Sequence, residues 1–107
     1  MSFEATLHVD EGAATVTLAG ELDARSAPRL NDLIIEASER PALRRLVLLM
    51  EELTYMSSAG LRCLVFAHQK MPREVEIVLV GTRPQVAETI RLTGFDRSVV
   101  MQEAAET

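Results

Sequence analysis

The chain has 107 residues, of which 48% are hydrophobic and 25% charged, and its formal net charge is −5 at pH 7. This is the length and composition of a single globular domain, residues 1–107, with one hydrophobic core. The negative charge, the lack of Trp and the scarcity of clustered Lys and Arg exclude nucleic acid as an expected partner, because phosphates and bases would find no matching surface.

The first predicted element is a β-hairpin. Apolar and polar side chains alternate along residues 3–9 and again along residues 14–18, on either side of the turn sequence Asp10-Glu11-Gly12. Alternation with a period of two predicts antiparallel strands with one face in water. His8 falls on the wet face, where we expect it to be solvated. Gly20 is expected to end the second strand.

A loop with the sequence GELDARSAP leads into the first predicted helix. Ser26 is a candidate N-cap and Pro28 suits the first turn, while Pro41 is expected to stop the helix. One stripe of this helix is predicted to be buried, because its apolar residues follow helical spacing. The stripe consists of Leu30, Leu33, Ile34 and Ala37.

Two apolar segments, Leu46–Met50 and Val75–Val80, are predicted strands. The first is apolar at every position, which indicates a central strand covered on both faces. It is also the longest apolar run, far short of the ~20 residues that span a bilayer. The N-terminal sequence MSFEATLHVD has no basic region followed by an apolar one. We therefore expect no secretion signal and no direct membrane insertion.

A second helix is predicted from about Ser58 to Lys70, and a third begins at Pro84. Gly94 is the expected left-handed residue after the third helix, and Ser98–Met101 is a short last strand. Strands that alternate with helices favour right-handed β-α-β crossovers and a mixed sheet, hence an α/β fold. The acidic end, residues 102–107, is expected to be a frayed or disordered tail.

The second helix carries apolar residues over much of its circumference. They lie on two stripes, the first formed by Leu61, Leu64 and Val65 and the second by Cys63, Phe66 and Ala67. Such a helix is either buried or covered by a partner, and burial is the favoured interpretation. His68 continues the first stripe and is expected to be partly buried.

The sequence lacks the residues that metal binding, nucleotide binding and serine hydrolysis require. His8, His68 and Cys63 are too scattered to predict a metal site, and no nucleotide-binding glycine motif occurs, so no cofactor is expected. The segment YMSSAG lacks the Gly-x-Ser-x-Gly elbow, and neither histidine has an evident orienting carboxylate, which argues against a serine hydrolase. The single cysteine excludes an internal disulfide and fits a reducing, cytoplasmic location.

Two adjacent serines, Ser57 and Ser58, stand at the start of the second helix. One hydroxyl in this place can cap the helix, a contribution of roughly 0.5–2 kcal/mol relative to Ala. A phosphate here would add about −1.5 to −2 charges at the positive end of the helix dipole. Capping needs only one hydroxyl, so the residues leave phosphorylation of the other as an open alternative.

Three segments resemble one known family. They are LAGELDARSAPRL at Leu18–Leu30, LVLLMEELTYMSSAGLRCLV at Leu46–Val65 and VAETIRLTGFDR at Val86–Arg97. In this order and spacing the chain resembles the STAS domain family, most closely its single-domain members, the bacterial anti-sigma factor antagonists. The resemblance implies an STAS-like mixed sheet with an N-terminal antiparallel hairpin and helices packed on it, and a binding module rather than an enzyme.

The resemblance also implies a switch. Unphosphorylated members bind an anti-sigma factor serine kinase and so free the sigma factor; phosphorylation by the kinase releases them, and a PP2C-type phosphatase resets the cycle. The family's acceptor serine precedes the loop glycine by two residues, which corresponds to Ser58, and Gly60 permits close backbone approach. The partner-binding residues implied in this way are Glu21, Asp23, Ser57, Ser58, Ala59, Gly60 and Arg62.

The chain departs from the family pattern at three positions. Ser57 stands where many members have Asp, Leu49 where many have Asp or Asn, and Ala59 where Ser or Thr is frequent. The loop is therefore less acidic, and Ser57 becomes an alternative acceptor. A second interpretation keeps the fold without the switch: an STAS subunit that docks constitutively on a lipid-transport ATPase or a signalling scaffold.

Overall fold

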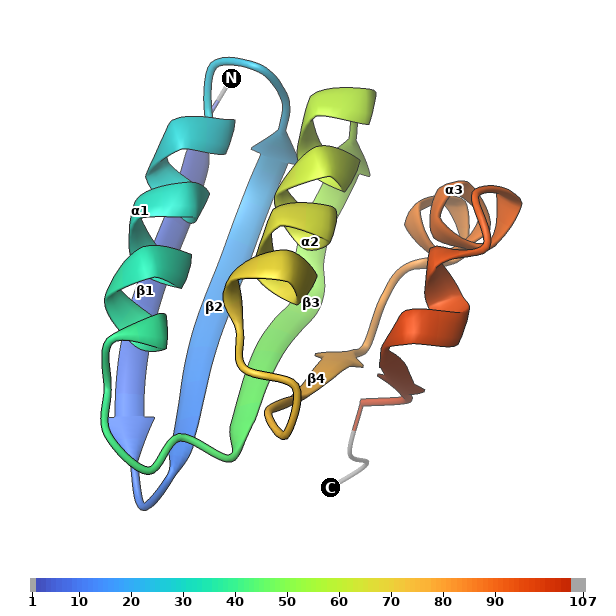
Figure 1. Ribbon diagram of the computed structural model, residues 1–107. Coiled ribbons are helices and arrows are strands. Elements are labelled where there is room, and N and C mark those ends of the chain that lie inside the picture. Colours follow the sequence, from blue (N-terminus) through green and yellow to red (C-terminus); the bar gives the residue numbers. More distant parts are fainter. Residues whose placement is uncertain (1, 105–107) are drawn as a thin grey trace.

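The computed structural model describes residues 2–104 as a five-stranded β-sheet with three α-helices and one short 3-10 helix (Figure 1). The strands are β1 (Phe3–Asp10), β2 (Ala13–Leu22), β3 (Arg45–Met56), β4 (Glu76–Val80) and β5 (Val100–Gln102). The helices are α1 (Ala27–Ser38), α2 (Ser58–Lys70), α3 (Pro84–Leu92) and the 3-10 helix η1 (Phe95–Ser98).

The N-terminal hairpin is present as predicted. β1 pairs with β2 in antiparallel register from Phe3 opposite Gly20 to Asp10 opposite Ala13. Glu11 and Gly12 both have positive φ, 47° and 85°, which is the conformation of the tight turns that join twisted antiparallel strands. The prediction that Gly20 ends the second strand is wrong, because β2 continues through Gly20 to Leu22 by pairing with β3.

The sheet order is β1-β2-β3-β4-β5, and β2 to β5 are all parallel. Each crossover therefore moves one strand further in the same direction. Because crossovers are right-handed, helices that connect strands in this order lie on the same face of the sheet. Figure 1 shows α1 and α2 side by side across one face of β1, β2 and β3.

One hydrophobic core lies between the sheet and the helices. It takes alternate residues from each long strand together with the inner stripes of all three helices. In β3 these are Leu46, Leu48 and Met50, which are fully buried. The intervening Val47 and Leu49 are only partly buried and do not belong to the core cluster. The prediction of a strand covered on both faces is therefore wrong: an apolar run indicates that a strand is central, but the helices cover only one face.

The three α-helices agree with the sequence prediction. The α1 stripe of Leu30, Leu33, Ile34 and Ala37 is buried, and the helix ends at Ser38, before Pro41. α2 has the predicted bounds. α3 begins at Pro84 and buries Val86, Ala87 and Ile90, and Gly94 follows its cap residue in the left-handed conformation with φ 79°.

Other strand boundaries also differ from the prediction; β4, for example, begins at Glu76 and not at Val75. β3 runs past Met50 to Met56, because irregular pairing with β2 carries the strand through its acidic and polar residues. β5 runs from Val100 to Gln102 and so begins two residues later and ends one residue later than predicted; Gln102 therefore belongs to the sheet and not to the tail. The rest of the predicted tail reaches beyond the described residues, which end at 104.

Within this part of the chain, each α-helix is too short or too polar to traverse a lipid bilayer.

Candidate partner-binding site at the start of helix α2

The segment that leads into α2 is held in place by buried side chains at the end of β3. Leu53 and Met56 face the core and are at most 5% exposed. The backbone N–H of Ser57 donates to the carbonyl of Leu22, at 2.9 Å. The end of β3 is thereby tied to the end of β2, and α2 starts from a fixed point.

The two serines at this point have different environments. Ser57 is the N-cap of α2: it has extended backbone angles, and its Oγ accepts a hydrogen bond from the N–H of Gly60 at 3.4 Å. Ser58 is the first helical residue and is exposed, and its hydroxyl forms no hydrogen bond with any residue between 2 and 104. Ser57 therefore has a structural role, while the Ser58 hydroxyl is available to a partner.

The loop between β2 and α1 is held together by its own hydrogen bonds. The Asp23 carboxylate accepts from the N–H of Arg25 at 2.9 Å and of Ser26 at 3.2 Å. The Ser26 hydroxyl donates to the carbonyl of Glu21 at 3.0 Å. The backbone hydrogen bonds from Arg25 and then Ser26 lower the pKa of Asp23 below its usual value, because they stabilise the carboxylate.

Ser26 does not cap α1 in the way that the sequence suggested. It occupies the N-cap position, but with helical backbone angles and without a side-chain bond to the helix. Its Oγ instead accepts from the N–H of Asp23 at 2.8 Å and so stabilises the loop. Pro28 does lie in the first turn of α1, as predicted.

Gly60 brings this loop and α2 into direct contact. A Cβ atom at Gly60 would lie 2.8 Å from Cγ of Met56 and 3.0 Å from the carbonyl oxygen of Leu22. Only a glycine allows the helix to approach the end of β2 this closely. The neighbours of Leu22 in sequence, Glu21 and Asp23, are thus on the same end of the molecule as the two serines.

The remaining expected partner-binding residues lie on the first turns of α2. Ala59 is half-buried, and Arg62 is exposed. Arg62 forms no ion pair within residues 2–104, where the ion pairs are Arg40 with Glu36 and Arg45 with Glu76. The site therefore presents free charges of both signs around an exposed hydroxyl.

Two features of this end of the molecule were not predicted from the sequence. Tyr55 pairs with Glu21 across β2 and β3, and its side chain is 50% exposed. A hollow of about 300 Å³ lies beside the loop and is lined by Phe3, Glu21, Asp23, Arg25, Ser26 and Arg29. Tyr55 could have been recognised as the chain's only tyrosine, but its exposure depends on the extension of β3 beyond Met50.

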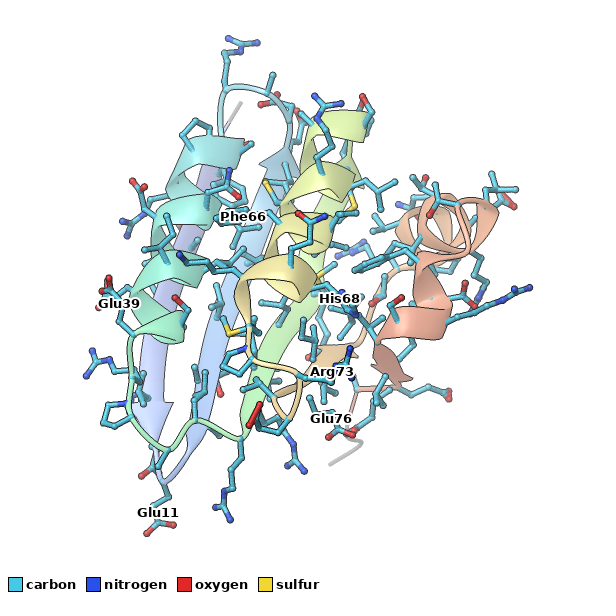
Figure 2. All side chains as sticks on the ribbon, viewed as in Figure 1. Glu11, Glu39, Phe66, His68, Arg73 and Glu76 are labelled. Atoms are coloured by element: carbon cyan, nitrogen blue, oxygen red, sulfur yellow. The ribbon has the colours of Figure 1, made fainter. Side chains whose placement is uncertain are left out.

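The two histidines that were considered as metal ligands or catalytic bases do not lie in a site of either kind within residues 2–104. His8 is exposed on β1, as expected, but His68 is also exposed, so the prediction of partial burial is wrong. The His68 ring instead lies edge-on to Phe95, with ring centroids 6.0 Å apart, and Figure 2 shows it near the C-terminal end of α2. Residues 2–104 contain no group of three or more His, Cys, Asp or Glu that could hold a metal ion.

Burial of α2 is also partial. Cys63, Leu64 and Ala67 are buried, whereas Val65 is 36% exposed. The Cys63 thiol lies 3.7 Å from the carbonyl of Ala27 in α1, and burial raises its pKa. Most of the inner surface of the helix belongs to the core. In the first stripe Leu61 is partly buried and Leu64 is buried, whereas Val65 and His68 are exposed.

The fold and this site together define a small α/β domain with a hydroxyl-bearing helix start beside the β2–α1 loop. Residues 4–107 match the model of the STAS domain. The chain belongs to the STAS domain family.

Solved structures with this fold include anti-sigma factor antagonists. An anti-sigma factor antagonist from Mycobacterium paratuberculosis superposes with a TM-score of 0.85 at 25% identity, over 94% of this chain and 86% of that chain. The anti-sigma factor antagonist SpoIIAA in its unphosphorylated form gives a TM-score of 0.75 at 18% identity, over 97% and 90% of the two chains. The phosphorylated form of SpoIIAA from Bacillus gives 0.73 at 20% identity, over 98% and 93%.

Proposed function

We propose that this protein is an anti-sigma factor antagonist whose binding is switched by phosphorylation of Ser58. Unphosphorylated, it binds and sequesters an anti-sigma factor serine kinase; phosphorylated on Ser58, it releases the kinase, and a PP2C-type phosphatase restores it. The protein itself is a binding module and not an enzyme. One observation carries the assignment to Ser58: this residue is exposed at the first position of α2 and its hydroxyl has no hydrogen-bond partner among residues 2–104, while the Ser57 hydroxyl caps the helix.

The position of Ser58 suits a switch physically. In the free protein a phosphate at a helix start is stabilised by the free backbone N–H groups and the positive end of the dipole. Under a docked partner, the same dianion would lose water, at a cost of several kcal/mol unless it is paired. Because about 1.4 kcal/mol changes affinity tenfold, this cost is sufficient to dissociate the complex.

The surroundings of Ser58 supply the remaining contacts. Glu21, Asp23 and Arg62 offer charged groups, and Tyr55 offers an exposed aromatic ring at the same end of the sheet. Aromatic and arginine side chains contribute strongly to protein interfaces. We therefore propose that the kinase contacts the β2–α1 loop and the first turns of α2 together.

The decisive experiment is phosphate mapping. The wild type, Ser58→Ala and Ser57→Ala are incubated with ATP and the candidate anti-sigma serine kinase from the same genome, and the products are mapped by mass spectrometry. We expect stoichiometric labelling of the wild type and Ser57→Ala at residue 58, and none of Ser58→Ala. Labelling at Ser57 alone would transfer the acceptor role to that residue.

A binding measurement separates the switch from constitutive docking. We expect Ser58→Asp to bind the kinase at least about tenfold more weakly than Ser58→Asn, which has similar size without the charge. Equal binding of the two variants, together with no labelling by the kinase, would support the alternative of an STAS subunit that docks constitutively on a lipid-transport ATPase or a signalling scaffold.

A further inference from the structure

A second hollow lies at the opposite end of α2 from Ser58. It has a volume of about 550 Å³ and is bordered by the C-terminal end of α2, the loop into β4, the first residues of β4, and the segment from η1 to β5. Small-molecule sites in proteins typically measure about 300–1,000 Å³. The hollow is therefore large enough for a small organic ligand, and it shares no residue with the proposed partner-binding site.

The charged rim of this hollow is predominantly positive, although the whole chain is negative. His68, Arg73 and Arg97 line it, and all three side chains are exposed. Its one acidic lining residue is Glu76, whose carboxylate accepts from Nε of Arg45 at 3.2 Å. In Figure 2, His68, Arg73 and Glu76 lie on the side of α2 and β4 that faces the C-terminal part of the chain.

The two arginines of the rim are not paired with Glu76, whose carboxylate lies 3.2 Å from Arg45. Neither Arg73 nor Arg97 belongs to the ion pairs formed between residues 2 and 104. His68 is oriented by its edge-on contact with Phe95. Lys70, in the last turn of α2, also offsets the negative end of the helix dipole, which would otherwise repel an anion. The rim thus offers guanidinium donors suited to an oxyanion.

The inner wall of the hollow is apolar. Met71, Val75 and Ile77 are buried there, Val99 is partly buried, and Val100 is 41% exposed. An inorganic ion would leave this wall in contact with water, whereas an apolar body would cover it, at roughly 25 cal/mol for each Å² removed from water. The wall and the rim together therefore favour a ligand with an apolar body and an anionic head.

We propose that this hollow binds a small organic anion of this kind, such as a medium-chain carboxylate, with the head group between Arg73 and Arg97 and the apolar body against Met71, Val75 and Val99. The site is independent of the phosphorylation of Ser58. A basic rim and an apolar wall in one hollow are the observations on which it stands.

The test is a titration of the 15N-labelled protein with octanoate below its critical micelle concentration, followed by amide chemical shifts. We expect shifts concentrated in residues 68–77 and 97–100. We also expect the affinity to fall at least about tenfold in Arg73→Gln/Arg97→Gln, which removes both head-group contacts. Arg25→Gln/Arg62→Gln removes the same charge at the other end of the molecule and should bind octanoate like the wild type.

Comparison of ligands on the wild type tests the two halves of the proposal without any substitution. Octylammonium and octan-1-ol should bind more weakly than octanoate, and so should inorganic phosphate. Equal binding of octan-1-ol would overturn the role of the rim, and equal binding of phosphate would overturn the role of the apolar wall. Binding to phosphatidylglycerol vesicles without binding of octanoate would identify a membrane contact and would also overturn the proposal.

Discussion

At the scale of single residues, two neighbouring serines with the same side chain differ in what they contact. Ser57, the residue after β3, has an extended backbone and accepts a hydrogen bond from the N–H of Gly60, whereas Ser58 is already helical and is exposed. The difference arises from the backbone: the extended angles of the N-cap residue turn its side chain back onto the free N–H groups of the first turn.

Substitution of each serine by alanine should separate the two roles. Ser57→Ala is expected to lower the free energy of unfolding by about 0.5–1 kcal/mol, in the lower part of the capping range because the hydrogen bond is long. Ser58→Ala should change it by less than about 0.5 kcal/mol. Urea denaturation measures both, and an equal loss for the two variants would contradict the assignment of the cap.

Asp23 gives the β2–α1 loop a dependence on pH. Its pKa is lowered by the backbone N–H groups of Arg25 and Ser26, so its contribution to loop stability is present above the pKa of the unfolded chain. It is lost as the pH falls through the lower pKa of the folded chain.

The carboxyl carbon resonance of Asp23, followed by NMR during acid titration, checks this. We expect a lower pKa in the folded protein than in the same protein unfolded in urea, and a concurrent change in the amide shifts of Arg25 and Ser26. Substitution Ser26→Ala should move the folded pKa upward, because the Ser26 hydroxyl, whose one proton is shared between the Glu21 carbonyl at 3.0 Å and the Asp23 carboxylate at 3.2 Å, helps to lower this pKa. An identical pKa in the folded and unfolded chains would refute the loop geometry.

At the scale of elements, the approach of α2 to the end of β2 depends on Gly60. Alanine normally stabilises a helix by about 1 kcal/mol relative to glycine. Here its Cβ would contact Leu22 and Met56 at 3.0 Å or less, including a backbone oxygen that cannot move alone. The packing conflict therefore outweighs the helix propensity.

Gly60→Ala should accordingly destabilise the protein by about 1–3 kcal/mol, the usual cost of overpacking. Thermal denaturation measures the change. Ala59→Gly is the control in the same turn, where loss of helix propensity alone should cost up to about 1 kcal/mol. An increase in stability for Gly60→Ala would show that α2 does not pack on Leu22.

The two faces of β3 provide a second comparison between neighbouring residues. Leu48 is fully buried beneath the helices, whereas Leu49 is partly buried on the other face. Leu48→Ala should cost about 2–5 kcal/mol, because it leaves a cavity in the core. Leu49→Ala should cost markedly less, since water can fill the space. Chemical denaturation of the pair tests whether helices cover one face of the sheet only.

At the scale of the whole molecule, the reactivity of the Cys63 thiol measures how often the folded domain opens. Its side chain is 2% exposed between α1 and α2, and burial raises its pKa, so the thiolate that reacts with disulfide reagents is scarce at neutral pH. A thiol in this place becomes reactive only when the core opens.

We expect Ellman's reagent to modify the native protein at least about a hundredfold more slowly than the urea-unfolded protein, because the folded state of a stable domain dominates the population. The rate should rise about tenfold in Leu48→Ala for each ~1.4 kcal/mol of unfolding free energy that is lost, and far less in Leu49→Ala. Rapid modification of the native wild type would contradict the burial of Cys63.

Local patterns predicted most of the elements of this fold. The hairpin, the α1 stripe, the bounds of α2 and the left-handed Gly94 were all predicted, because each depends on residues close together in the chain. The length of β3 was not, since acidic and polar residues interrupt the apolar pattern after Met50 and the strand continues because β2 pairs with it. The prediction that His68 is partly buried was also wrong. His68 is the last residue of the first stripe of α2, and the exposure of this end of the stripe depends on where α3 and η1 pack.

The candidate site was likewise predicted only in part from the sequence. Its residues were identified from the sequence through the likeness of three segments to the STAS family, and the structure brings the β2–α1 loop against the start of α2 through Leu22 and Gly60. The exposed ring of Tyr55 and the hollow beside Asp23 were not predicted, because both are formed by residues that meet only when distant segments pack.

The amino-acid order alone determined where strands and helices form and which stripe of most helices is apolar, because these properties follow from periodicity over a few residues. Tertiary packing decided that all the helices lie on one face of the sheet, since this depends on the direction of successive crossovers. It also decided which serine caps α2 and which remains free, because the backbone at Ser57 is set by its bond to Leu22, thirty-five residues earlier in the chain.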